Sequence, residues 1–380
     1  MSATIRRLDG WTVSGCVAAA LLLAVYPSNR LMAQDSQFGI RGLGTPGKSE
    51  SVRARSTGGA FAPFDPFSPL LDASLADVRR ITAGVTGGTS WRSVDAGGAN
   101  ASLRGTRFPA FVLAGPITKR ITLGGGFATY LDRTFGVLTQ DTIVLRGVPE
   151  PISDELRSDG AISDLRLAAA TRLRSWLAVG AGIHLITGST RVSAIRRFND
   201  STTYRNSTSR DEVAYGGRGA SLSALADVTQ DLRLAIWGRS DTRLRASIGG
   251  VTKANDDLPL SYGAGIRWHA GSQVGLAGAV AWHKWAAGSS PPPNSHDTFE
   301  WSLGAELGPP GTPLRFGARR GQLPFGIGKA PTEFGIVGGL GKVFSGGRGR
   351  LDIGVERLDR KGSGLNERVW TLLLGLTVRP

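Results

Sequence analysis

The chain has 380 residues, of which 41% are apolar and 54 are glycine, and its formal net charge is +15. Its single cysteine, Cys16, excludes a disulfide framework and a thiolate metal site. The sequence shows no basic helix and no aromatic RNA-binding motif, so we expect no nucleic-acid partner and assign the excess charge to loops facing anionic lipid head groups.

The first 33 residues have the features of a secretory signal peptide. Arg6 and Arg7 supply the positive start, and residues 16–26 form an unbroken apolar run of eleven residues. That run is shorter than the ~20 residues that a transmembrane helix needs. We therefore expect residues 1–33 to direct export, with cleavage after Ala33.

Residues 34–68 are rich in Gly, Pro and Ser, and residues 69–77 could form one or two helical turns. From residue 78 onward, apolar and polar residues alternate in one segment after another. The predicted strands are 78–94, 103–116, 121–132, 161–173, 176–192, 212–228, 232–248, 258–269, 273–285, 298–308, 313–322, 333–344, 350–358 and 367–379. Two longer polar connections are expected at 136–159 and 198–210.

The last predicted strand shows the pattern most clearly. One face carries Trp370, Leu372 and Leu374, whereas the other carries Thr371 and Gly375. A two-residue period is typical of a strand whose two sides meet unlike environments. In a soluble sandwich the apolar face would meet a second sheet. In an outer-membrane barrel it meets lipid, while the polar face lines the interior.

Two further observations favour the barrel. The strand count is even, as it is in bacterial single-chain barrels. Tryptophans lie mostly near the ends of predicted strands, where the aromatic girdles of such barrels occur, and these are Trp176, Trp268, Trp282, Trp285, Trp301 and Trp370. The expected fold is therefore an all-β, transmembrane antiparallel β-barrel of about 14 strands in the bacterial outer membrane.

An ordered series of short motifs precedes the first predicted strand. It consists of Gly-Leu-Gly at 42–44, Ala-Arg-Ser-Thr-Gly-Gly-Ala-Phe-Ala at 54–62, Asp65, and Ser-Pro-Leu-Leu-Asp-Ala-Ser-Leu-Ala at 68–76. This series resembles the N-terminal segment of the outer-membrane long-chain fatty-acid transporter superfamily (FadL type). The chain departs from the family pattern at residues 71–72, where Leu-Asp replaces the usual Asn-Pro. Segments 232–240, 314–319 and 351–357 also look like strands of that family.

The resemblance implies three parts: a signal peptide at 1–33, a plug at 34–77 and a barrel at 78–380. The residues that would belong to the plug are Gly58, Gly59, Ala60, Asp72, Ala73 and Ser74. The resemblance also implies a lateral opening at an inward kink of an early strand. The candidates for that kink are Pro109, Gly124, Gly125 and Gly126. A flexible linker in place of the plug, and ordinary barrel curvature in place of the kink, remain the alternatives.

The polar face of the strands carries charges that we expect to cross the interior. These candidate lumen charges are Arg233, Arg267, Arg315, Arg319, Glu300, Glu306 and Glu356. The four histidines, His184, His269, His283 and His296, have no metal-like spacing, and no serine lies in a nucleophile elbow. We therefore expect no catalytic residues, no metal and no cofactor, and hence no enzyme.

The resemblance thus implies passive uptake of hydrophobic small molecules, either fatty-acid-like or aromatic hydrocarbons. The alternatives are an interaction or secretion-associated barrel of the same fold, and a general porin. Expected partners are hydrophobic small molecules, outer-membrane lipid and lipopolysaccharide, and a protein at the extracellular loops.

Overall fold

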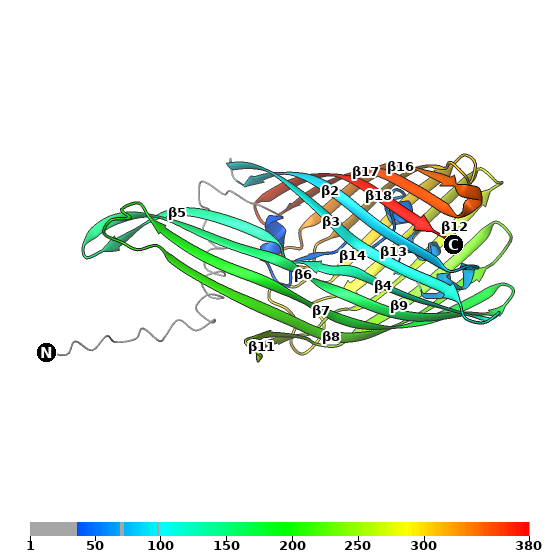
Figure 1. Cartoon of the computed structure of the whole chain (residues 1–380), viewed down its shortest axis with the longest axis horizontal. Coiled ribbons are helices and arrows are strands. Elements are labelled where there is room, and N and C mark those ends of the chain that lie inside the picture. The colour runs from blue at the N-terminus through cyan, green and yellow to red at the C-terminus, as the bar shows by residue number, and fades with distance from the viewer. Residues whose placement is uncertain (1–35, 69–71, 97–98, 380) are drawn as a thin grey trace.

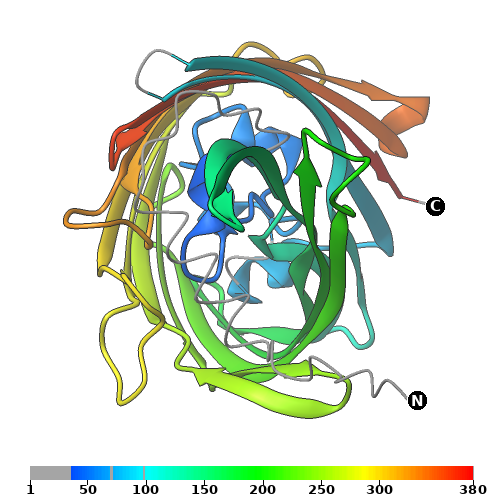
Figure 2. The ribbon, with the colours of Figure 1, turned by 90° about the vertical axis from the view of Figure 1, so that its left-hand side faces the viewer.

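Antiparallel strands form a closed wall around an N-terminal segment (Figures 1 and 2). The computed structural model describes residues 36–68, 72–96 and 99–379, so the predicted signal peptide and its cleavage after Ala33 lie outside the described residues. Within these ranges the wall has fourteen strand positions, which confirms the predicted fold class. No helix among the described residues is long and apolar enough to cross a membrane.

Consecutive strands of the wall pair with each other, and β18 pairs with β2 to close the ring through Trp370 and Trp91. The strands are β2 (Thr82–Ala96), β3 (Ala99–Pro116), β4 (Ile121–Asp132), β6 (Val148–Arg174), β7 (Leu177–Phe198), β8 (Ser207–Asp227), β9 (Leu232–Asp241), β12 (Leu260–Ala270), β13 (Val274–Lys284), β14 (Thr298–Leu307), β15 (Leu314–Gln322), β16 (Thr332–Phe344), β17 (Gly349–Gly362) and β18 (Leu365–Val378). In such a ring each strand has a partner on both sides, so neither end of the sheet is exposed as an open edge strand to hydrocarbon.

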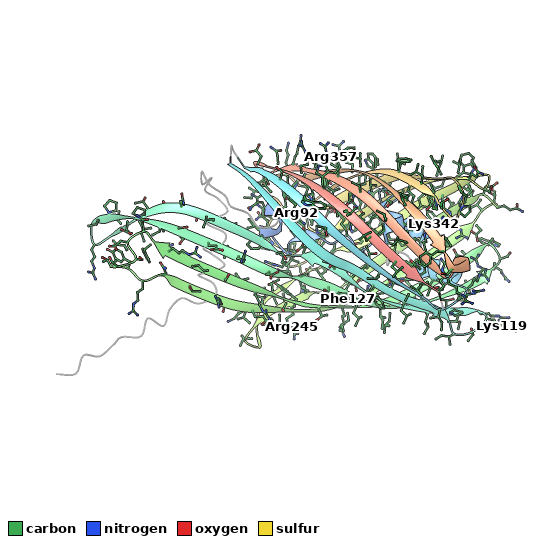
Figure 3. The ribbon with its side chains drawn as sticks, turned by 45° about the horizontal axis from the view of Figure 1, so that its top comes forward. Arg92, Lys119, Phe127, Arg245, Lys342 and Arg357 are labelled. Atoms are coloured by element: carbon green, nitrogen blue, oxygen red, sulfur yellow. The ribbon has the colours of Figure 1, made fainter. Side chains whose placement is uncertain are left out.

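Side chains on the two faces of each strand differ in exposure, as the alternation in the sequence predicts. In β18, Trp370 and Leu374 are 45% and 50% exposed, whereas Leu373 is fully buried. The same contrast separates Phe316, which faces outward, from Arg315, which has no exposed surface. Figure 3 shows side chains projecting from the side of the wall that faces the viewer and along its outline, with Phe127 of β4 labelled. An apolar outer band and a polar interior are the properties of a transmembrane β-barrel.

The two ends of the barrel differ. At one end, which we call the short-turn end, brief turns such as 117–120 and 271–273 join the strands. At the other end β6, β7 and β8 continue well beyond the rest, with 27, 22 and 21 residues, although ~9–11 suffice to cross a bilayer. Figure 1 shows this sheet projecting to the left, and we call that end the projecting end. Long connections mark the extracellular side of such barrels.

The projecting end contains three strands that the sequence pattern did not predict. The expected connection 136–159 is instead β5 (Phe135–Leu145) followed by the first part of β6. The expected single strand 232–248 is interrupted at Thr242 and Arg243, and the chain resumes as β10 (Leu244–Ile248) paired with β8 and with β11 (Val251–Asp256). Both corrections concern chain outside the apolar band, where neither face of a strand has to be apolar.

The N-terminal segment lies inside the ring, as the blue elements of Figure 2 show. Its elements are η1 (Gln37–Ile40), β1 (Thr45–Pro46), α2 (Val52–Arg55), η2 (Ala62–Phe64) and η3 (Asp72–Asp77). The short helix α2 begins because the Ser51 hydroxyl accepts a hydrogen bond from the Ala54 amide at 3.1 Å. It ends before Gly58 and Gly59, which both have positive φ.

Candidate functional site

Glycines bring the N-terminal segment directly against the inner wall. A Cβ on Gly58 would lie 2.7 Å from the carbonyl oxygen of Ala318, and its φ is +69°. The wall glycines Gly304 and Gly317 are equally restricted, because a Cβ on either would collide with the backbone of Thr57. The backbone of the segment therefore packs on strands β14 and β15 where side chains would otherwise keep it away.

Basic residues of the segment meet acidic residues of β14–β17. Arg53 pairs with Glu306 at 2.5 Å, and Glu306 also pairs with Arg315 at 2.8 Å. Arg315 in turn pairs with Asp352 at 2.8 Å. Buried charges of opposite sign thus alternate from the segment into the wall, which is the arrangement that offsets the cost of burying them.

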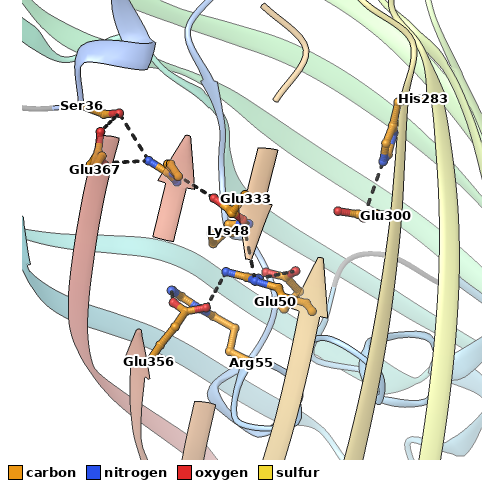
Figure 4. A network of polar contacts seen from close by, with 11 residues as sticks. Ser36, Lys48, Glu50, Arg55, His283, Glu300, Glu333, Glu356 and Glu367 are labelled. Atoms are coloured by element: carbon orange, nitrogen blue, oxygen red, sulfur yellow. Dashed lines mark hydrogen bonds and ion pairs between the residues drawn. The ribbon is translucent and has the colours of Figure 1, made fainter. Parts of the chain in front are cut away.

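A second chain of charges lies nearer the projecting end, and Figure 4 shows part of it. Lys48 pairs with Glu333 at 2.6 Å, and Arg360 joins Glu333 to Glu367 at 2.7 and 3.1 Å. The Ser36 hydroxyl donates to Glu367 at 2.7 Å. Beside this chain, Glu356 accepts hydrogen bonds from Arg55 of the segment and from Arg319 of β15.

On the opposite wall the signs are reversed. Asp72 of η3 pairs with Arg166 of β6 at 2.5 Å. Asp77, at the end of η3, pairs with Arg172 at 2.7 Å and with Arg233 at 2.5 Å. The basic half of the segment and its acidic half therefore each contact wall charges of the opposite sign.

All seven candidate lumen charges point into the barrel. Arg315, Arg319, Glu306 and Glu356 belong to the first charge clusters, and Arg233 binds Asp77. Arg267 lies 5.4 Å from the ring centroid of Phe64 in η2, a cation–π contact. Glu300 lies apart from these clusters, close to His283.

The remaining residues of the expected plug also lie in the segment. Ala60, Ala73 and Ser74 are fully buried, and the Ala73 amide donates to Ser223 Oγ at 2.9 Å. Gly59 has φ +93°, a conformation that favours glycine, whereas its surroundings leave room for a Cβ.

The wall has a gap between β3 and β4. Their ladder runs from Pro116 and Thr122 to Ala110 and Ala128, and the described residues form no β3–β4 pair beyond that point. Past Ala128, the β4 edge pairs instead with β1 of the N-terminal segment, through Pro46 opposite Leu131. The segment thus takes the place that β3 leaves.

Gly124, Gly125 and Gly126 lie within uninterrupted ladders on both sides, so the β3–β4 ladder does not end at these three candidates for the kink. These glycines serve close approach instead, because a Cβ on Gly124 would lie 2.8 Å from Leu75 Cδ2 of η3. The ladder ends beside Pro109, and the β4–β6 register shifts between Thr129 and Leu131.

A cavity of about 220 Å³ occupies the lumen next to this gap. Its lining includes Pro46 and Gly47 of the segment and Ala128, Thr129 and Tyr130 of β4. It lies between two apolar clusters. The cluster toward the projecting end joins Leu43, Trp285 and Phe325, and the one toward the short-turn end joins Phe61, Phe64 and Trp237.

The cavity wall holds a polar group that sequence reasoning missed. His184 Nδ1 lies 2.9 Å from Asp164 Oδ2, and His184 Nε2 lies 2.8 Å from Ser221 Oγ. The order is that of an acid–histidine–serine triad. The Ser221 hydroxyl, however, donates to Asp72 Oδ2 at 2.6 Å, so its proton is directed to that carboxylate rather than to His184, and a negative charge lies beside the oxygen that would have to attack. The group therefore links η3 to the wall and is poorly arranged for nucleophilic attack.

A similar arrangement faces the cavity from the neighbouring strands. His283 Nδ1 contacts Ser261 Oγ at 2.8 Å, and His283 Nε2 lies 3.6 Å from Glu300 Oε1 (Figure 4). No group of three or more potential metal ligands occurs among the described residues. Neither histidine pairing is visible in the sequence, since each depends on the register between strands.

Comparison with known proteins identifies the fold. No family model and no curated protein sequence matches the chain. Among solved structures, a Pseudomonas aeruginosa FadL homologue has a TM-score of 0.63 at 11% identity, covering 88% of this chain and 99% of that one. The Ralstonia pickettii toluene transporter TbuX has a TM-score of 0.59 at 14% identity, covering 87% and 98%. The monoaromatic hydrocarbon channel CymD has a TM-score of 0.55 at 14% identity, covering 87% and 98%. The chain therefore has the fold of the FadL-type barrels.

Proposed function

We propose that this protein admits hydrophobic small molecules passively through the bacterial outer membrane, by way of the lumen cavity and the gap between β3 and β4. The observation that carries the proposal is that the cavity borders the β4 residues Ala128–Tyr130, where β4 has parted from β3. The solved structures of similar fold include proteins described as a toluene transporter and a monoaromatic hydrocarbon channel, which supports a hydrophobic substrate.

The packing of the lumen favours a sideways exit. A molecule moving straight toward the short-turn end would have to displace Phe61 and Phe64, which are 0% and 2% exposed, from their cluster. A sideways exit requires displacement only of β1, a strand of two residues. It also delivers an apolar molecule directly to lipid, which is a more favourable medium for that molecule than water. In this proposal the N-terminal segment acts as the plug.

A cross-link between β1 and β4 tests this route. Thr45 and Asp132 are directly paired, so Thr45→Cys with Asp132→Cys places two thiols at a separation suited to a disulfide. We expect oxidised cells that carry this variant to lose uptake of radiolabelled toluene, and a reductant to restore it. The matched control is Ala83→Cys with Leu113→Cys, a β2–β3 pair in the continuous wall. Undiminished uptake by the oxidised β1–β4 variant would overturn the route.

The projecting sheet supports a second candidate function, an interaction barrel with a protein partner at its extracellular end. Cross-strand ion pairs brace this sheet, with Arg196 pairing with Asp154 at 2.7 Å and Arg197 pairing with Glu155 at 2.9 Å. Shortening β6 and β7 by residues 149–156 and 194–198 would leave the cavity and the gap intact. Toluene uptake that survives this change assigns transport to the lumen, whereas its loss favours the interaction role.

A further inference from the structure

Two carboxylates at the lumen cavity lack a close cationic partner. Glu300 points into the lumen, yet 54% of its side chain is exposed there, and its ion-pair contact is His283 at 3.6 Å. Glu50 lies 4.0 Å from Arg319, and its buried Oε2 has no hydrogen-bond partner among the described residues.

Other charged side chains that line the cavity have an ion-pair partner, although Arg239 Nη2 and Arg319 Nε make no hydrogen bond among the described residues. Lys48 binds Glu333 at 2.6 Å, and Arg239 binds Asp164 at 2.6 Å. Arg319 is held by a hydrogen bond to Glu356. The acceptors that remain available to a ligand are therefore carboxylate oxygens of Glu50 and Glu300.

These carboxylate acceptors favour a ligand that carries a hydrogen-bond donor. A hydrocarbon that displaces water from the cavity would leave Glu50 without a donor and Glu300 with only its contact to His283 at 3.6 Å, which is costly for charged groups removed from water. A ligand carboxylate would add a third negative charge beside them. A ligand that carries a hydroxyl or amino group can instead donate to them, and hydrogen bonds to charged groups are the stronger kind.

The volume of the cavity and its aromatic lining residues indicate the size of the ligand. A cavity of about 220 Å³ is below the ~300–1,000 Å³ of drug-sized ligand pockets and closer to the ~150 Å³ cavity that holds benzene in an engineered protein. Trp237 and Trp285 line the cavity from β9 and from the chain after β13, and they are 8% and 5% exposed. Aromatic side chains in the lining can pair with one aromatic ring of a ligand.

We infer that the cavity binds a single-ring aromatic compound bearing a hydrogen-bond donor, with its ring against Trp237 and Trp285 and its donor on Glu300 and Glu50. This inference rests on the proposed function, because it names the substrate class of the same lumen. The inferred ligand differs from an unsubstituted hydrocarbon, which has no donor, and from a long-chain fatty acid, which is larger and carries a carboxylate.

Phenol and toluene form the test pair, because a hydroxyl and a methyl group are similar in size. Equilibrium dialysis of the purified full-length protein in detergent, with protein-free micelles subtracted, gives the affinity for each compound. We expect phenol to bind about tenfold more tightly than toluene or better. Equal affinities, or displacement of phenol by low concentrations of palmitate, would overturn the inference.

Variants locate the donor site. Glu300→Leu and Glu50→Leu should each reduce the preference for phenol by removing an acceptor, while toluene affinity stays the same or rises. The control is Glu212→Gln, an exposed carboxylate of β8 that lies 4.0 Å from Arg191. Far-UV circular dichroism shows which variants are folded, and a full preference in both folded glutamate variants would place the site elsewhere.

The dialysis result and cellular uptake separate the two hypotheses. Uptake of toluene together with equal affinities for phenol and toluene retains the proposed function and rejects the inference. Tight phenol binding without uptake of either compound retains the inference and rejects transport.

Discussion

Arg315 has no exposed surface, and its guanidinium lies between Glu306 and Asp352. Arg315→Met would keep much of the side-chain volume and leave two buried carboxylates with one cation fewer. Removing one partner of a buried ion pair costs about 3–5 kcal/mol, so we expect the free energy of unfolding to fall by roughly that amount. Urea unfolding in lipid vesicles, followed by tryptophan fluorescence, measures the change.

The matched control for this variant is Arg368→Met. Arg368 pairs with Asp359 at 3.2 Å, but 59% of its side chain is exposed, so the pair contributes little. An effect of similar size in both variants would contradict the role assigned to burial.

The sequence predicts that the Arg315 side chain points into the barrel, but it does not predict which residues Arg315 pairs with. Alternation along 314–319 shows that Arg315 and Arg319 share the inner face. It contains no information on which residue of the N-terminal segment arrives opposite them, because that depends on the register and stagger of distant strands. The contact of His184 with Asp164 and Ser221, which come from β6 and β8, could not be predicted for the same reason.

At the scale of elements, the contact between α2 and the wall depends on glycine. Gly317→Val would drive a side chain into the backbone of Thr57, and overpacking of this kind costs about 1–3 kcal/mol. We expect the segment around α2 to be displaced, with faster proteolysis within 48–60. Gly338→Val is the control, because Gly338 faces outward and its nearest neighbours are 3.7 Å or more from a Cβ. Equal protease resistance in both variants would argue against close packing of the segment.

Strands were predictable only where lipid faces them. Inside the apolar band each strand needs one apolar face, so a two-residue period appears in the sequence. Beyond the band no face of a strand has to be apolar, and residues 149–159 include charged residues such as Glu150, Asp154 and Arg157. The first half of β6 therefore appeared as a polar connection. The resemblance alone implied a lateral opening at an early strand, and the gap between β3 and β4, beyond Ala128, became clear only from the pairing.

For the molecule as a whole, the two charged halves of the N-terminal segment attach to opposite walls. Its basic half is bound to β14–β17 and its acidic half to β6 and β9. The segment therefore joins two sides of the barrel across the lumen, while β1 contacts β4 beside the gap by a single short pairing. A movement confined to β1 would open the gap and leave both sets of ion pairs in place.

This arrangement predicts the consequence of removing the segment. Deletion of residues 34–69 downstream of the predicted signal peptide would remove β1, α2, η2 and the cations at 48, 53 and 55, and leave a water-filled lumen whose wall is open only at the gap between β3 and β4. We expect a steady leak conductance in planar bilayers well above that of the full-length protein, because the deleted residues lie inside the ring and the β18–β2 pairing that closes it does not involve them. Heat-modified mobility on electrophoresis would show that the deleted barrel has folded. Unchanged conductance of the folded deletion variant would contradict the plug and return a general porin to consideration.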